Sequence, residues 1–129
     1  MEAPKRILVT PLDWGLGHAT RCIPLIKELQ RQNCIVFIAS SGRAHDLLKK
    51  EFFLTVRVFE IDGYDPVYPD GDGMVVKMGL QLGKFLSIIK KEQEQVEKIV
   101  ERNAIDMVIS DNRYGCYSTK VKSVIITHQ

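Results

Sequence analysis

"VTPLDWGLGHATR", residues 9–21, joins a short β-prone run to an amphipathic helical pattern through a turn that contains Gly15, Gly17 and His18. Glycine-rich turns between a strand and a helix often bind phosphate, because the backbone N–H groups of the first helical turn point at the ligand. The histidine suggests a second role, since imidazole is the commonest general base in proteins. The turn therefore predicts either a nucleotide-binding loop or a loop that takes part in chemistry.

Strand-like and helical segments alternate along the rest of the chain. Short apolar runs, typical of strands buried on both faces, predict strands at residues 6–11, 34–40, 54–61, 105–110 and 123–128. Helical periodicity predicts helices at residues 18–31, 42–51 and 74–103. This order predicts an α/β fold with a Rossmann-like, doubly wound parallel sheet.

Composition narrows the class of protein. A length of 129 residues suits a single domain, and a net charge of only +2 argues against nucleic acid as the main partner. The three cysteines, Cys22, Cys34 and Cys116, are widely spaced and predict neither a disulfide framework nor a metal site. With no signal-peptide pattern at the start, we expect a cytoplasmic protein. Because the sequence stops at residues 127–129, directly after a predicted strand, we expect it to be the front part of a longer protein.

Ligands of doubly wound sheets bind beyond the carboxyl ends of the strands. A dinucleotide site is one interpretation of the first turn, but Thr20 stands where the third glycine or an alanine belongs. The second strand ends in residues 40–43, Ser-Ser-Gly-Arg, which suit a 2′-phosphate better than a ribose hydroxyl, so an NADP-type module stays open. Gly15 and Gly17 also fit a tight turn that binds nothing.

The histidine favours chemistry. His18 lies at the predicted start of the first helix, whose positive dipole end disfavours a protonated ring. A general base needs a group that orients it, and Asp111 follows the fourth predicted strand, which neighbours the first in this topology. We therefore expect a His18–Asp111 pair. The alternative is a capping or packing histidine beside an aspartate that only shapes a turn.

Two stretches resemble a known family. "GLGHATRCIPLIKELQRQNCIVFIASSG", residues 15–42, resembles the opening of GT-B glycosyltransferases, the group that includes peptidoglycan N-acetylglucosaminyltransferases and macrolide, plant and lipid glycosyltransferases. "SDNRYGCYSTKVKSVIITHQ", residues 110–129, resembles the late acceptor-domain segment of bacterial glycosyltransferase-related proteins. The likeness covers essentially the whole chain. Leu16 separates Gly15 from Gly17, whereas the peptidoglycan enzymes carry a Gly-Gly pair before their histidine.

The resemblance implies an N-terminal, acceptor-binding domain of a two-domain enzyme, residues 1–129, with the nucleotide-sugar domain outside this chain. It implies metal-independent, inverting transfer of a sugar from a nucleotide sugar to an acceptor hydroxyl. We expect the nucleotide sugar to be UDP-linked. His18 would be the catalytic base and Asp111 its partner, with no separate cofactor, and this domain would be inactive alone. A sugar-nucleotide epimerase half is the alternative within the fold, and an NADP-type regulatory module the alternative outside it.

Further polar residues are candidates for substrate contact. The two candidate anion partners are Arg21 and Arg113, although a solvated or structural arginine is the alternative for each. The remaining substrate-binding candidates are Gly15, Gly17, Asn112, Thr127 and His128. His128 has the alternative role of beginning a linker.

The third predicted helix carries a row of lysines that is relevant to which partners the protein binds. Lys77, Lys84 and Lys91 recur every seven residues beside Met74, Leu80 and Leu86. Such a surface suits either the inner face of a membrane that carries a lipid-linked acceptor, or a solvated helix face.

Overall fold

The structure is a computed structural model that describes residues 3–12, 16–61, 74–111, 113 and 115–126. Within the long helix it describes side chains from residue 82 onward, except at position 85.

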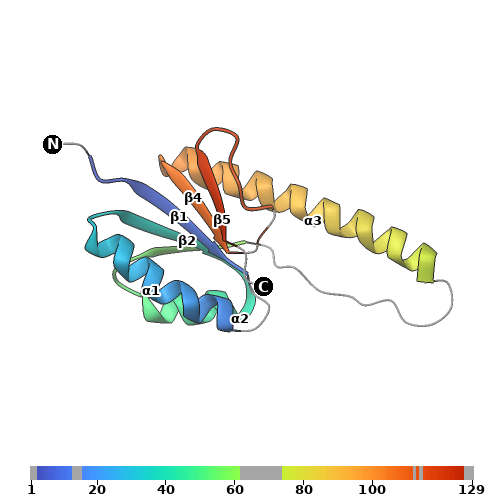
Figure 1. The fold of residues 1–129 in the computed structure, drawn as a ribbon, viewed down its shortest axis with the longest axis horizontal. Helices are drawn as coiled ribbons and strands as arrows, with labels where there is room; N and C mark the ends of the chain where they lie inside the picture. Colours follow the sequence, from blue (N-terminus) through green and yellow to red (C-terminus); the bar gives the residue numbers. More distant parts are fainter. Residues whose placement is uncertain (1–2, 13–15, 62–73, 112, 114, 127–129) are drawn as a thin grey trace.

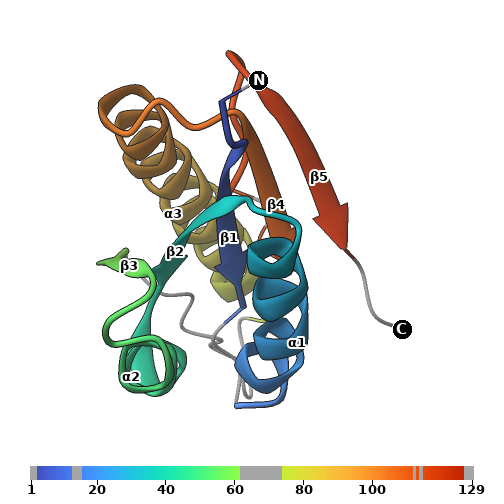
Figure 2. The same ribbon diagram turned by 90° about the vertical axis from the view of Figure 1, so that its left-hand side faces the viewer.

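Five parallel strands form one sheet with helices on both faces (Figures 1 and 2). The strands are β1 (Arg6–Pro11), β2 (Ile35–Ser40), β3 (Arg57–Glu60), β4 (Met107–Asp111) and β5 (Lys122–Ile126), in the order β3-β2-β1-β4-β5. Helices α1 (Gly17–Arg31) and α2 (Gly42–Glu51) cover one face, and α3 (Met74–Arg102) covers the other. The predicted Rossmann-like parallel sheet is confirmed.

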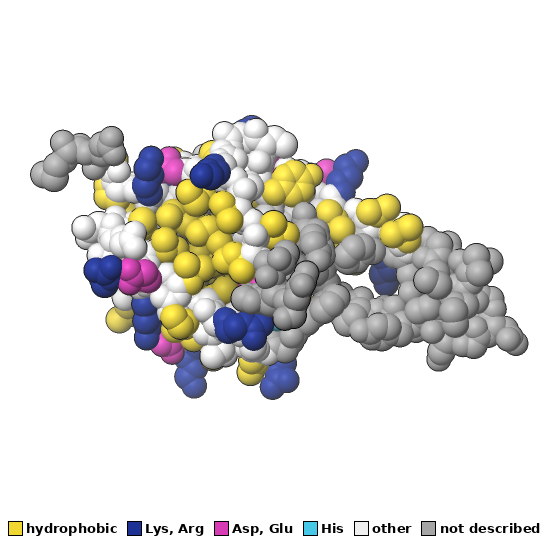
Figure 3. Space-filling model, in the orientation of Figure 1, with side chains coloured by type: hydrophobic (Ala, Val, Ile, Leu, Met, Phe, Trp, Pro, Cys, Tyr) yellow, Lys and Arg dark blue, Asp and Glu magenta, His cyan; other side chains and the backbone are white. Residues whose placement is uncertain are grey.

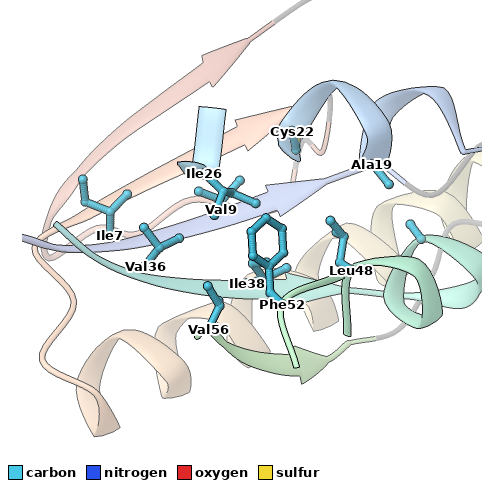
Figure 4. Close-up of a cluster of buried hydrophobic side chains, with 11 residues drawn as sticks. Ile7, Val9, Ala19, Cys22, Ile26, Val36, Ile38, Leu48, Phe52 and Val56 are labelled. Atoms are coloured by element: carbon cyan, nitrogen blue, oxygen red, sulfur yellow. The ribbon is translucent and has the colours of Figure 1, made fainter. Parts of the chain in front are cut away.

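Strand β1 lies at the centre because both of its faces are apolar. Ile7 and Val9 pack against Ile26 of α1 and Leu48 of α2 in one buried cluster (Figure 4). Leu8 points to the opposite face, into a second cluster that includes Val96, Val100 and Val108. Burying each such side chain contributes about 1.5–3 kcal/mol, so the two clusters fix the sheet between its helices.

Several element boundaries differ from the predicted ones. The strand predicted at residues 54–61 is shorter, β3 (Arg57–Glu60), because the chain first turns after α2: Thr55 and Val56 N–H both donate to the Phe52 carbonyl at 3.2 Å. β4 begins at Met107, later than predicted, and β5 ends at Ile126.

No residue that the structure describes between β4 and β5 is helical. Parallel strands are usually joined by a helix that covers one face of the sheet. Here Val124 and Ile125, which point to opposite faces of the edge strand β5, are exposed. In the view of Figure 3, hydrophobic side chains gather beside β5.

The exposed side of α3 carries both charge and apolar surface. Lys84, Lys91 and Leu86 are exposed, whereas the side chains of Met74, Lys77 and Leu80 lie outside the described residues. Among the helices that the structure describes, none is both long and apolar enough to cross a membrane.

The loop after β4 touches α3 so closely that only glycine fits. A Cβ added at Gly115 would lie 2.6 Å from the Ile89 carbonyl oxygen and 3.0 Å from the Cβ of Glu92. Because the first contact is with helix backbone, the clash cannot be relieved by rotating a side chain. This contact therefore sets the distance between the loop and α3.

We expect Gly115→Ala to lower the free energy of unfolding by about 1–3 kcal/mol, the usual cost of overpacking. Gly83→Ala is the matched control, because a Cβ there meets nothing within 4 Å and alanine is the better helix former by about 1 kcal/mol. Urea denaturation of both variants measures the difference. Equal stability of the two variants would contradict the close contact.

Candidate functional site

His18 and Asp111 meet at the carboxyl end of the sheet. Pairing of β1 with β4 sets Pro11 opposite Asp111, and the Leu12 N–H donates to the Asp111 carbonyl at 3.0 Å. α1 begins at Gly17, so His18 stands in its first turn. His18 Nδ1 lies 3.2 Å from Asp111 Oδ2, with 16% and 4% of the two side chains exposed. The expected contact between these residues is therefore present.

The contact with Asp111 is compatible with one tautomer of the imidazole ring. When Nδ1 carries the proton, it donates to the Asp111 carboxylate and leaves a lone pair on Nε2. A histidine in this form accepts a proton through Nε2 while the carboxylate stabilises the resulting positive charge. The pair has the arrangement of a general base and its orienting acid.

Arg21 approaches the same ring. Its Nη2 lies 3.3 Å from His18 Nδ1, one helical turn away. The guanidinium also lies over the start of α1, since a Cβ added at Gly17 would be 3.5 Å from Arg21 Nη1. Arg21 thus adds an exposed positive charge beside the His18–Asp111 pair.

The buried thiol of Cys22 contacts the Asp111 carboxylate. Cys22 Sγ donates to Asp111 Oδ2 over 3.8 Å, one turn beyond His18. Burial, together with the charge of Asp111, raises the pKa of Cys22 to about 12. The thiol therefore keeps its proton and acts as an uncharged donor to Asp111.

Arg113 is fully buried and forms an ion pair with Glu92 of α3. Its Nε and Nη2 donate to the two Glu92 carboxylate oxygens at 3.2 and 2.9 Å. Its Nη1 donates to the Pro11 carbonyl at 3.3 Å and to Ser41 Oγ at 2.9 Å. The guanidinium, predicted as an anion partner, thus connects α3 to the ends of β1 and β2, which agrees with the structural alternative.

The sequence model of glycosyl transferase family 1 matches residues 5–127, nearly the whole chain. The chain belongs to this family. A comparison with curated protein sequences finds none that matches at a significant level.

Solved structures show where this family 1 fold recurs. UGT2 of Phytolacca americana, complexed with UDP-2fluoro-glucose and pterostilbene, superposes with a TM-score of 0.62 at 18% identity, over 98% of this chain and 31% of that one. The glycotransferase of kitacinnamycin gives 0.61 at 16% identity, over 98% and 31%. The C-terminal domain of the PF1911 hydrogenase of Pyrococcus furiosus gives 0.60 at 17% identity, over 97% and 93%. These identities establish a shared fold alone.

The chain spans about a third of the length of the two transferases that it matches. The resemblance to a GT-B domain, predicted from the sequence, is confirmed by the family and by the fold. Because one α/β fold hosts unrelated functions, as the hydrogenase domain illustrates, the site has to carry the functional argument.

Four predicted site residues of this family 1 chain, Gly15, Asn112, Thr127 and His128, lie outside the described residues. Four of the other five lie together at the start of α1 and the end of β4: His18, Asp111, Gly17 and Arg21. The fifth, Arg113, lies inside the sheet–helix interface. In the part of the chain that the structure describes, no group of three or more His, Cys, Asp or Glu side chains could hold a metal ion.

Glu92 is the residue that sequence reasoning missed. Its spacing gives a signal, since it falls three residues after the half-buried Ile89 and four before the buried Val96 on one face of α3. A charged residue at an apolar stripe position needs a buried partner of opposite charge. Arg113 is that partner.

We expect Arg113→Met to lower the free energy of unfolding by about 3–5 kcal/mol, because it leaves the Glu92 carboxylate buried without its cation. The double variant Glu92→Leu/Arg113→Met should recover most of this loss, since apolar groups replace both charges. Denaturant midpoints of the two variants and the wild type give the comparison. A double variant as unstable as the single one would show that the charges are not coupled.

The cysteines should differ in reactivity. The folded chain should react with iodoacetamide at pH 8 at Cys34 and be protected at Cys22 and Cys116. Burial raises the pKa of Cys22 to about 12 and that of Cys116 well above its ordinary value, and the thiolate is the reactive form. Peptide mass spectrometry with and without urea reads the labelling. Labelling of Cys22 before unfolding would contradict its burial against Asp111.

Proposed function

We propose that this chain is the acceptor-binding domain of a glycosyltransferase in which His18 is the general base and Asp111 orients it. The observation that supports this most directly is the contact between His18 Nδ1 and Asp111 Oδ2 at the carboxyl end of the sheet. Ligands of doubly wound sheets bind at this end. Membership of glycosyl transferase family 1 makes sugar transfer the chemistry that such a base would serve.

The proposed reaction is a single displacement with inversion at the anomeric carbon. The acceptor hydroxyl gives its proton to His18 Nε2 while its oxygen forms the new bond to the anomeric carbon. The bond from that carbon to the donor's phosphate oxygen breaks, and the nucleoside diphosphate leaves with the electron pair. Asp111 stabilises the imidazolium that results.

The donor is proposed from the neighbours in fold. UGT2 of Phytolacca americana was solved with UDP-2fluoro-glucose and pterostilbene, and LpCGTa was solved with UDP. We therefore propose a UDP-linked donor and a hydroxyl-bearing acceptor. Because this chain spans about a third of UGT2, a second domain of the whole protein is proposed to make most donor contacts. No separate cofactor or metal is part of the proposal.

Turnover of UDP-sugars by the full-length protein tests the base. We expect His18→Ala to lower kcat by about 10²–10⁴-fold, the usual contribution of a general base. Asp111→Asn should also lower kcat, because an amide that turns its N–H toward Nδ1 favours the wrong ring form. Measuring release of UDP and of the sugar product gives both values.

His45→Gln is the matched control, because His45 is a buried histidine that contacts Ser40 and Glu60 and not the His18–Asp111 pair. Its turnover should stay near that of the wild type. Unchanged turnover in His18→Ala would exclude His18 as the base. NADP binding by the chain, with no turnover on any nucleotide sugar, would favour the dinucleotide module.

A further inference from the structure

Within the part of the chain that the structure describes, two groups of opposite hydrogen-bonding character lie near Nδ1 of His18. Asp111 Oδ2, at 3.2 Å, accepts a hydrogen bond, whereas Arg21 Nη2, at 3.3 Å, only donates one. One ring nitrogen of a neutral imidazole cannot satisfy both, because it carries either a hydrogen or a lone pair. The two contacts therefore belong to two different tautomers.

The two tautomers differ in what they offer a substrate. With the hydrogen on Nδ1, the ring bonds to Asp111 and Nε2 presents a lone pair, the form that a base requires. With the lone pair on Nδ1, the ring accepts from Arg21 and Nε2 carries the hydrogen, so it cannot take a proton. The position of Arg21 therefore determines whether His18 is ready to act as a base.

We propose that Arg21 is a positioning residue that competes with Asp111 for His18 Nδ1, and that a phosphate-type anion drawing Arg21 away sets the base-ready tautomer. The anion meant here is the diphosphate of the nucleotide sugar, and in that respect the inference rests on the proposed function. Donor binding would then prepare the base.

The surroundings of Arg21 suit this role. Within the described residues Arg21 forms no ion pair with a carboxylate, unlike Arg31 of the same helix, which donates to both oxygens of Glu28 at 2.6 and 2.8 Å. Its guanidinium lies beside Gly17 at the start of α1, where the helix dipole also favours an anion. Arg21 is exposed, so its side chain reaches an incoming anion without displacing core groups.

Nitrogen-15 NMR of the chain with labelled histidine tests the competition directly, at a pH where the ring is neutral. The His18 signals are those that His18→Gln removes from the spectrum of the three histidines. We expect Arg21→Met to raise the ratio of the Nδ1–H to the Nε2–H form about tenfold, the equilibrium value of one charge-assisted hydrogen bond. Inorganic pyrophosphate should raise this ratio in the wild type and leave Arg21→Met unchanged.

Arg31→Met is the matched control, since it removes an arginine of α1 that is paired with Glu28, and its ratio should equal that of the wild type. Equal ratios in the wild type and Arg21→Met would overturn the competition. An equal pyrophosphate effect in both would overturn the role of Arg21 in sensing the anion. The readout needs no turnover, so a His18→Ala enzyme of full activity would refute the proposed base and leave this competition standing.

Discussion

The parallel pairing of β1 with β4 is the constraint on which the site depends. It places Pro11 opposite Asp111. The side chains of His18 and Asp111, which are 93 positions apart in the sequence, come together as a result. The pairing follows from burial: β1 is apolar on both faces and lies at the centre, where a strand on each side satisfies its backbone. Any shift of this register would move Asp111 by a whole residue relative to the start of α1.

The buried Glu92–Arg113 pair connects this central register to the helix behind it. Taking two charges out of water is costly, and the pair offsets the cost with two hydrogen bonds between its members and two more to Pro11 and Ser41. An apolar pair would fill the same space without specifying any geometry. The ionic pair instead fixes which part of α3 faces the ends of β1 and β2, and Gly115 lets the following loop lie against that part.

The sequence predicts local patterns and their topology better than it predicts long-range charge pairing. The apolar runs predicted five strands, and the alternation with helices placed His18 and Asp111 at one edge of the sheet, because these features follow from periodicity and chain order. Arg113 was predicted as a candidate anion partner because it follows the fourth strand, with a solvated or structural arginine as the alternative, and nothing near it in sequence reveals its partner. Glu92 lies 21 positions away on a helix whose buried face depends on the finished fold. The start of β3 likewise depended on the turn at Phe52, which the β-branched residues Thr55 and Val56 conceal because they favour a strand.

Cys22 has a consequence for the charge balance of the proposed reaction. Because the pKa of this thiol is raised to about 12, it supports Asp111 without adding a second negative charge. The pair of Asp111 and Arg21 is then electrically neutral around an uncharged His18 ring. When His18 takes the acceptor proton, the summed charge of the Asp111, Arg21 and His18 side chains rises from zero to +1, at the moment when the departing diphosphate gains negative charge. A thiolate in place of the thiol would bring the resulting net charge of this group back to zero, so the proton held by the buried sulfur atom preserves the electrostatic attraction between enzyme and leaving group.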